Sequence, residues 1–230
     1  MIKLENTDVM NMDNAIRGMR NPMDSWHKSD SHQSVFTNDG KGGFVFGEND
    51  LKLAQSLAHN GSDHRKFLRQ IMVSVDITAP LYWWKEFDTY KVGTVANSCS
   101  TMHTIHKRDL TLDDFSHDKL LDNGDKRALC YLNDGYYSST PKDVLENIID
   151  ALNIYRRSYI ETGDKTYWYQ IIQLLPSSYN QMRTVTLNYE VLLNQYHARK
   201  QHKLSEWLDY CEWVKSLPYF KEICLNDSDI

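Results

Sequence analysis

Residues 71–84 read IMVSVDITAPLYWW, a strand pattern that runs directly into a helix start. Apolar side chains occupy every second position from 71 to 77, which is the period of a strand that buries one face. Pro80 then precedes an aromatic run, and proline is well suited to the first turn of a helix. The stretch therefore predicts a strand, a turn and a helix in direct succession.

The rest of the chain alternates further helices with short strands. Apolar spacing predicts strands over 1–5, 44–46 and 184–187, and helices over 9–19, 49–58, 141–155, 165–174, 191–198 and 204–217. Residues 92–103 have the polar composition of a loop, and residues 106–140 have that of an insertion with little core of its own. No repeat or linker divides the chain. We expect a single α+β domain over 1–230, with a mixed or antiparallel sheet flanked by helices.

Composition narrows the class of partner. The chain has 230 residues, of which 41% are hydrophobic, enough for a core without disulfides or metals. Its formal net charge of −5 argues against binding a nucleic-acid polymer, which needs a basic face. A small anionic ligand remains compatible with this charge.

Cysteine usage and hydropathy predict a cytoplasmic protein. The four cysteines show no CxxC spacing, which is typical of free thiols in a reducing compartment. No apolar run approaches the ~20 residues that cross a bilayer, so we expect no membrane association. His103 and His106 are three residues apart, but no third ligand is well placed, and we expect no metal site.

Polar residues on both sides of 71–84 have a characteristic spacing. His64 lies sixteen residues before Pro80, and residues 89–102 read TYKVGTVANSCSTM. This order of histidine, helix-opening proline and polar loop resembles the signature region of the flavin-dependent thymidylate synthase (ThyX) family, RHRxxSxNExSxR. The spacing agrees better than the residue types do.

The differences from that signature are specific. Residues 89–91 replace the Arg, His and Arg of the motif, although Lys91 keeps a positive charge. Asn97 and Ser100 match after one extra residue, while Ser98 replaces the family glutamate and Met102 replaces its last arginine. The resemblance therefore implies a similar scaffold with fewer positive charges.

A second segment resembles the carboxy-terminal strand and helix of the same family without a gap. It contains Leu175, Pro176, Thr186, Leu187, Asn188, Asn194 and Arg199. By this resemblance, Asn188 and Asn194 lie near the flavin, and Arg199 contacts the pyrimidine nucleotide. Asparagine amides suit the mixed donors and acceptors of a flavin edge, and the planar fork of arginine suits paired oxygens.

The resemblance implies FAD as cofactor, held by His64, Lys91, Asn188 and Asn194. It implies a dUMP-like nucleotide held by Glu86, Asn97, Ser98, Ser100 and Arg199, with Glu86 standing where the family usually has glutamine. Reduced nicotinamide and methylene-tetrahydrofolate would serve an active enzyme, and the family is tetrameric, with each site built from several subunits. We expect a homotetramer.

Other interpretations stay open at this stage. Asn188 could simply cap a helix, Arg199 could be a solvated arginine, and His64 could be a surface residue. The chain could be a catalytically inactive nucleotide-binding or interaction protein, or one that sequesters a nucleotide. In the inactive case, Trp83 and Trp84 with Tyr82 would be a contact or stacking surface, with packing in a core or in an oligomer as the alternative.

Overall fold

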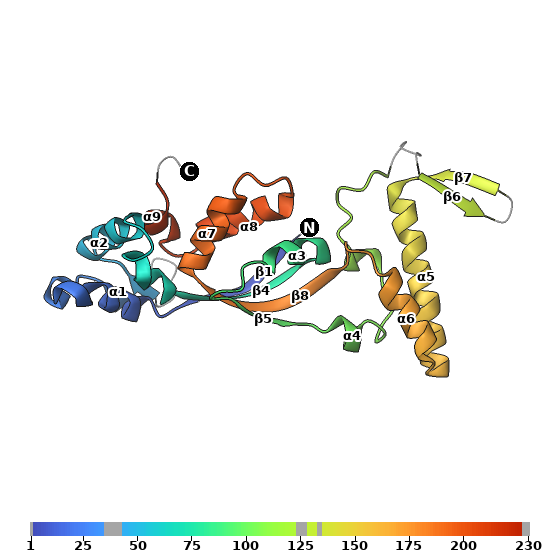
Figure 1. Cartoon of the computed structure of the whole chain (residues 1–230), viewed down its shortest axis with the longest axis horizontal. Helices are drawn as coiled ribbons and strands as arrows, with labels where there is room; N and C mark the ends of the chain where they lie inside the picture. The colour runs from blue at the N-terminus through green and yellow to red at the C-terminus, as the bar shows by residue number, and fades with distance from the viewer. Residues whose placement is uncertain (1, 35–42, 123–127, 133–134, 227–230) are drawn as a thin grey trace. The chain divides into compact units, whose positions relative to one another are not determined.

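The computed structural model describes residues 2–34, 43–122, 128–132 and 135–226. It combines helices with antiparallel sheet (Figure 1), which confirms the α+β prediction. Backbone contacts divide the chain into two compact units. The first consists of Met1–Lys3, Thr78–Phe87 and Ser98–Arg183, and the second of Leu4–Ile77, Asp88–Asn97 and Thr184–Ile230. That both units form one domain over 1–230 stays a prediction.

A four-stranded sheet with strand order β1-β4-β8-β5 has most of its residues in the second unit. The strands are β1 (Lys3–Met10), β4 (Met72–Pro80), β5 (Val95–Ser98) and β8 (Asn180–Asn188). Ile71, Val73, Val75 and Ile77 are fully buried, whereas the residues between them are half-buried, so the predicted alternation is confirmed. Pro80 ends β4 and Leu81 begins the next helix, as the sequence predicts.

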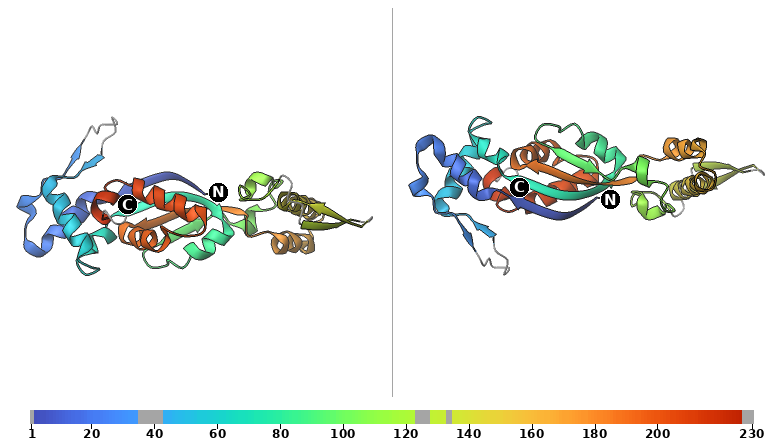
Figure 2. Two further views of the ribbon diagram at one scale, coloured as in Figure 1. Left: turned by 90° about the horizontal axis from the view of Figure 1, so that it is seen from above. Right: turned by 90° about the horizontal axis from the view of Figure 1, so that it is seen from below.

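Helices cover this sheet on one side. Figure 2 shows α7 and α8 over one face of the sheet. The helices of the unit are α1 (Met12–Arg20), α2 (Glu48–His59), α7 (Tyr189–Arg199), α8 (Ser205–Ser216) and α9 (Phe220–Cys224), with the 3-10 turns η1 (Asn21–Met23), η2 (Trp26–Lys28) and η3 (Arg65–Arg69). A hairpin of β2 (His32–Ser34) and β3 (Gly43–Val45) pairs His32 with Val45. Both α8 and η3 pack against α7.

One face of α8 is buried. Trp207, Tyr210 and Val214 are fully buried, as helical spacing requires. Leu208 is 40% exposed. It lies one position beyond Trp207, about 100° around the helix, and so faces away from the buried side.

The first unit contains a helical pair with its own core. Its elements are α3 (Leu81–Phe87), α4 (Thr101–Thr104), η4 (Leu112–Asp114), β6 (Ala128–Leu132), β7 (Gly135–Ser139), α5 (Pro141–Thr162) and α6 (Lys165–Leu174). The hairpin of β6 and β7 is antiparallel, with Leu132 opposite Gly135. Thr140 caps α5 by accepting a hydrogen bond from the Asp143 amide at 3.1 Å, and Pro141 occupies the first turn, as predicted.

Two residues of the predicted insertion contribute to this core. Leu110 and Phe115 are buried against Leu145, Ile149 and Leu152 of α5. Charged and turn-forming residues dominate the composition of 106–140, so the sequence did not indicate that these apolar side chains, five positions apart, pack against α5. Residues 123–127 and 133–134 of the insertion lie outside the described residues.

Three strands of the four-stranded sheet differ from the prediction, and the first of them, β1, covers Lys3–Met10 rather than the expected 1–5. We expected a strand over 184–187, but β8 begins at Asn180, because backbone pairing continues beyond the apolar positions. The Cys99 amide donates a hydrogen bond to the Met182 carbonyl at 2.9 Å. β5 lies within the predicted loop 92–103, and all four of its residues are exposed, so it carries no apolar alternation to predict it.

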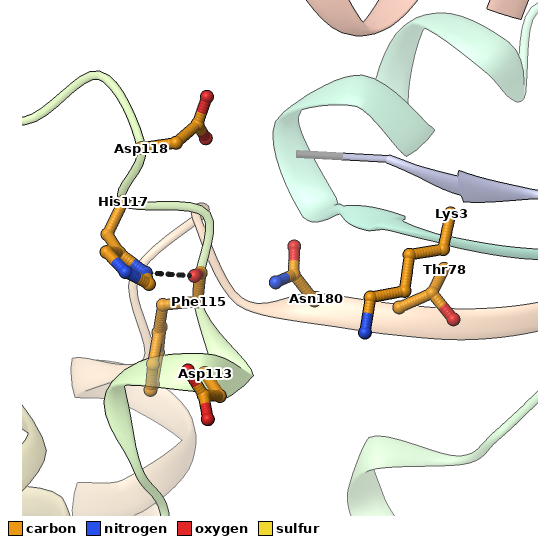
Figure 3. Close-up of a pocket in the computed structure, with 7 residues that line it drawn as sticks. All are labelled: Lys3, Thr78, Asp113, Phe115, His117, Asp118 and Asn180. Atoms are coloured by element: carbon orange, nitrogen blue, oxygen red, sulfur yellow. Dashed lines mark hydrogen bonds between the residues drawn. The ribbon is translucent and has the colours of Figure 1, made fainter. Parts of the chain in front are cut away.

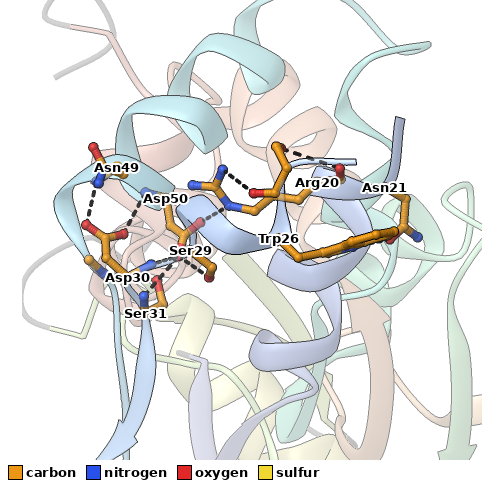
Figure 4. Close-up of polar contacts among 10 residues, drawn as sticks. Arg20, Asn21, Trp26, Ser29, Asp30, Ser31, Asn49 and Asp50 are labelled. Carbon is orange, nitrogen blue, oxygen red and sulfur yellow. Dashed lines mark hydrogen bonds and ion pairs between the residues drawn. The ribbon is translucent and has the colours of Figure 1, made fainter. Parts of the chain in front are cut away.

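A buried ion pair links the ends of α1 and α2. Arg20 is 4% exposed and Asp50 is fully buried, with Nε and Oδ1 2.5 Å apart (Figure 4). The hydroxyl of Ser29 also donates to Asp50, at 2.7 Å, as does the amide of Ser31, at 2.9 Å. Burial acts to raise the pKa of Asp50, but the hydrogen bonds from Ser31, Ser29 and Arg20 outweigh it, so this pKa is lowered.

The side chains of three of the four cysteines are described in the structure, and all three are unpaired. Cys99, Cys211 and Cys224 are free thiols, while the side chain of Cys130 lies outside the described part of the structure. Among residues 2–34, 43–122, 128–132 and 135–226, no helix is both long enough and apolar enough to cross a membrane.

Candidate functional site

Two candidate cofactor residues, His64 and Asn194, lie at η3 and on α7, two elements that pack against each other. His64 immediately precedes η3, and its side chain is exposed. Asn194 is exposed on α7, and its Oδ1 accepts a hydrogen bond from Nη2 of Arg65 at 3.5 Å. The structure thus connects Asn194 to the residue that follows His64 in the chain.

The same place holds two arginines and a glutamate that the sequence analysis did not single out. Glu190 pairs with Nε of Arg65 at 3.1 Å and also with Arg69. Arg69 also lies within 3.4 Å of the Ser62 carbonyl and is half exposed. The sequence feature that could have revealed these two arginines is their spacing, because Arg65 follows His64 directly and Arg69 lies four residues further on. Arg65 and Arg69 place two positive charges beside Glu190, and Arg65 also reaches Asn194.

The carboxylate of Glu190 is held ionised by these contacts. Burial acts to raise its pKa, but hydrogen bonds from Arg69 and Arg65, with their positive charges, lower it below the ordinary value. One carboxylate opposes two guanidinium groups, so the three side chains carry a net positive charge at neutral pH. We call Arg65, Arg69, Glu190 and Asn194 the arginine cluster.

Asn188 is buried and serves as the N-cap of α7. Its Oδ1 accepts a hydrogen bond from the Val191 amide at 3.1 Å, so the helix-capping interpretation is confirmed. Its other amide atom, Nδ2, faces Gly93, where an added Cβ would lie only 2.9 Å away. Gly93 has φ of +74°, a conformation that favours glycine. Asn188 therefore has a structural role, and a role toward a cofactor stays a prediction.

Arg199 is held between two aromatic rings rather than solvated. Its Nε donates to the Tyr90 hydroxyl at 3.0 Å, and its Cζ lies 4.6 Å from the centre of the Trp207 ring. Trp207 is fully buried, and Arg199 is half-buried. Cation–π contact and hydrogen bonding fix the plane of this guanidinium. Such pre-organisation suits recognition of paired oxygens.

The other five predicted site residues are divided between the two units. Lys91 is exposed in the same segment as Tyr90, and Asn97 is exposed on β5; both belong to the second unit. Glu86 on α3 is half-buried, Ser98 is exposed and Ser100 precedes α4; these three belong to the first unit. The functional roles of all five stay predictions.

Trp83 and Trp84 do not form a surface. They are 0% and 1% exposed, and Trp83 stacks on Phe87 with ring centres 5.0 Å apart. The contact-surface interpretation is therefore wrong, and burial in a core is correct. Aromatic residues in the first turn of a helix can be exposed or buried, so the sequence alone does not decide between a contact surface and a core. The packing of the side chains decides it.

The first unit also has a pocket of about 320 Å³ (Figure 3). It is lined by Lys3, Thr78, Asp113, Phe115, His117, Asp118 and Asn180. Figure 3 shows His117 turned toward the Phe115 carbonyl, 2.9 Å from its Nδ1, and Asp118 turned the other way. None of the residues predicted from the sequence lines this pocket. In the described part of the chain, no three His, Cys, Asp or Glu side chains gather as metal ligands would.

Comparison with solved structures identifies the fold. The chain has the fold of flavin-dependent thymidylate synthases, although no family model and no curated protein matches it by sequence. One structure with this fold is thymidylate synthase X (ThyX) of Helicobacter pylori with FAD and dUMP, at a TM-score of 0.65 and 18% identity. The match covers 99% of this chain and 98% of that one.

Two further structures share the arrangement. A second structure of Helicobacter pylori ThyX, also complexed with FAD and dUMP, gives a TM-score of 0.63 at 18% identity, covering 98% of each chain. The UMP/dUMP methylase PolB of Streptomyces cacaoi, bound with 5-Br dUMP, gives a TM-score of 0.56 at 14% identity. That match covers 97% of this chain and 93% of PolB. At these identities the likeness shows the fold alone.

Proposed function

We propose that this protein binds FAD and a dUMP-like pyrimidine nucleotide on its ThyX-type scaffold. The observation that supports this proposal most is the contact of Asn194 with Arg65, next to His64 and Glu190. These residues come from segments 125 or more positions apart, and the fold brings them together. Two of them, His64 and Asn194, are cofactor positions implied by the family resemblance.

The side chains of the arginine cluster suit the chemistry of FAD. Arg65 and Arg69 offer guanidinium N–H groups to a pyrophosphate or to flavin carbonyl oxygens, and Asn194 offers an amide with both donor and acceptor. Exposed Lys91 would add one more positive charge. Bound FAD would supply the redox chemistry, and the chain would supply its binding and orientation.

The nucleotide part of the proposal depends on Arg199. Its guanidinium is fixed by Tyr90 and Trp207, so little conformational entropy is lost when it binds the oxygens of a pyrimidine. Asn97, Ser98 and Ser100 would add polar contacts from the signature segment, and Glu86 would face the same ligand. If the protein is active, it would transfer a one-carbon unit from methylene-tetrahydrofolate with reduced nicotinamide. A homotetramer and a cytoplasmic location belong to this proposal.

Cofactor binding is tested by the visible absorption spectrum of the purified protein, measured before and after FAD is added. Gel filtration in the same run gives the mass of the assembly. Flavin absorbance that co-elutes with the protein is the expected result, and a tetramer mass would support the assembly.

Arg65→Gln should weaken FAD binding about ten- to a hundredfold, because a charge-assisted hydrogen bond is lost. Lys66→Gln is the matched control, since Lys66 is exposed and adjacent in sequence. Equal FAD affinity in both variants would contradict the assignment.

A second function has specific support. Glu190 already neutralises part of the positive charge of Arg65 and Arg69, and residues 89–91 lack the signature arginines. Both observations favour a protein that binds the nucleotide without FAD and does not catalyse methylation. A colourless protein that binds dUMP, as measured by calorimetry, would establish this function instead.

A further inference from the structure

The second unit contains a small pocket of about 130 Å³ that shares no residue with the arginine cluster. Its walls come from α1, from the segment that follows η1, and from the hairpin of β2 and β3. We call it the α1–hairpin pocket. Its lining includes three apolar and three polar side chains, those of Ile16, Trp26, Phe44, Asp13, Arg17 and Gln33. A cavity of about 150 Å³ holds one benzene molecule, so this pocket has room for a single six-membered ring.

The indole of Trp26 is fixed in orientation yet half exposed. Its Nε1 donates a hydrogen bond to Oδ1 of Asn21 at 2.8 Å, and Figure 4 shows the ring beside Asn21. The residue is 49% exposed, although tryptophan is on average highly buried in folded proteins. A ring surface that is already oriented loses little conformational entropy when a planar ligand stacks on it. Trp26 therefore suits an aromatic ligand.

The second aromatic ring of the pocket is held by its neighbours. Phe44 packs edge-on against Phe46 with ring centres 5.2 Å apart, and Phe46 packs against Tyr219 with ring centres 4.8 Å apart. Ile16, which is 2% exposed, adds an aliphatic surface from α1. The apolar part of the pocket thus consists of side chains that are already in position, which favours binding of a rigid ring over a flexible chain.

The charges around the pocket cancel. Arg20 lines the pocket but pairs with the buried carboxylate of Asp50. Asp13 offsets the positive charge of Arg17, and the imidazole of His32 adds no charge while it is neutral. A charged ligand would therefore gain no net attraction to compensate for the loss of its hydration, and a neutral ligand is favoured.

Gln33 and Arg17 retain hydrogen-bonding groups for such a ligand. Among the residues that the structure describes, the side-chain amide of Gln33 has no hydrogen-bond partner. Nη2 of Arg17 donates to Oδ1 of Asn14 at 2.9 Å, and a guanidinium has five N–H donors in total. An amide group offers both a donor and an acceptor, so an amide on the ligand would complement the amide of Gln33.

We propose that the α1–hairpin pocket binds a neutral small molecule with one aromatic ring and an amide edge. The ring stacks on Trp26 and contacts Phe44, and the amide bonds to Gln33 and Arg17. This is a second binding site on the chain, and it does not depend on the proposed binding of FAD or of a nucleotide, because it shares no residue with those sites.

Titration of the intact chain with benzamide, followed by ligand-observed NMR, tests the inference. Trp26→Ala should weaken benzamide binding about tenfold or more, because the stacking surface is lost. Trp213→Ala is the matched control, since Trp213 is a half-buried tryptophan of α8 in the same unit that does not line the pocket. This control should bind benzamide as the wild-type protein does.

The amide and the ring are tested separately. Gln33→Leu should weaken benzamide binding about two- to tenfold, as for one lost hydrogen bond, and change the binding of toluene less than about twofold. Cyclohexanecarboxamide keeps the amide but has no planar ring, so the wild-type protein should bind it more weakly than benzamide.

Three results would overturn the inference. The wild-type protein could fail to bind benzamide up to its solubility limit. Trp26→Ala could bind it as tightly as the wild-type protein does, which would place benzamide elsewhere. Trp26→Ala and Trp213→Ala could weaken binding equally, which would indicate a general effect on the fold. Thermal unfolding of each variant detects such an effect, and Gln33→Leu then decides the question, because Gln33 is exposed.

Discussion

Nε of Arg199 donates a hydrogen bond to the hydroxyl of Tyr90 over 3.0 Å, which joins the segment after α3 to the last turn of α7. By the resemblance to the ThyX signature, Tyr90 stands in place of its histidine. The contact therefore links the altered motif of this chain to the arginine that the resemblance assigns to the pyrimidine. It makes the orientation of Arg199 depend on Tyr90.

Loss of Arg199 should abolish nucleotide binding. Arg199→Ala removes the guanidinium altogether, and we expect dUMP affinity to fall by about a hundredfold or more, as for a lost bidentate contact. Tyr90→Phe removes only one hydrogen bond to Arg199 and should weaken dUMP binding about two- to tenfold. Calorimetry measures both affinities. A Tyr90→Phe effect as large as that of Arg199→Ala would show that Tyr90 contributes more than orientation.

A side chain at position 93 should disturb Asn188. Gly93→Ala places a Cβ 2.9 Å from Nδ2 of Asn188, at a φ of +74°. We expect a loss in the free energy of unfolding of about 1–3 kcal/mol, together with weaker FAD binding. Gly163→Ala is the matched control, because Gly163 has φ of +68° and an added Cβ would have no neighbour within 4 Å. The control should lose stability from backbone strain alone and keep its FAD affinity.

The ion pairs of Glu190 should make stability depend on pH in a defined direction. The pKa of Glu190 is lowered in the folded protein, so its stabilisation is complete above the ordinary pKa near 4.5 and is lost as the pH falls through the lower folded value. At pH 7, Glu190→Gln should cost about 1–2 kcal/mol, discounted because Arg69 is half exposed.

Urea unfolding of the wild-type protein and of Glu190→Gln at pH 7, 5 and 3.5 gives this difference directly. We expect the gap between the two proteins to be similar at pH 7 and pH 5 and to narrow at pH 3.5. A gap that widens on acidification would contradict the sign of the pKa shift.

The Arg20–Asp50 pair should contribute more to the free energy of unfolding than the exposed ion pairs do. Asp50→Asn leaves Arg20 buried without its counter-charge and should cost about 3–5 kcal/mol in the free energy of unfolding. Lys52→Gln breaks the exposed pair of Lys52 and Glu48 on the same helix and should cost about 0.5 kcal/mol or less. Unfolding by guanidinium chloride gives the free energy of unfolding of both variants and of the wild-type protein. Similar costs would show that the buried pair is not a structural requirement.

Local sequence patterns were sufficient for most of the elements. The alternation over 71–77, the helix start at Pro141 and the helix over 165–174 each depend on neighbouring residues, so the sequence predicts them without knowledge of the fold. β5 could not be predicted in this way. Its residues are exposed on an edge strand, and only the pairing of its backbone defines it.

The sequence by itself determined the class of the fold, the order of the elements and the candidate positions His64, Asn188, Asn194 and Arg199, because these follow from local periodicity and from spacing along the chain. Tertiary structure alone decided what those positions contact. It brought Arg65 and Arg69 to Glu190, some 120 residues away, and it placed Trp83 and Trp84 in a core. Contacts between distant segments depend on how the elements pack, and no local pattern encodes that packing.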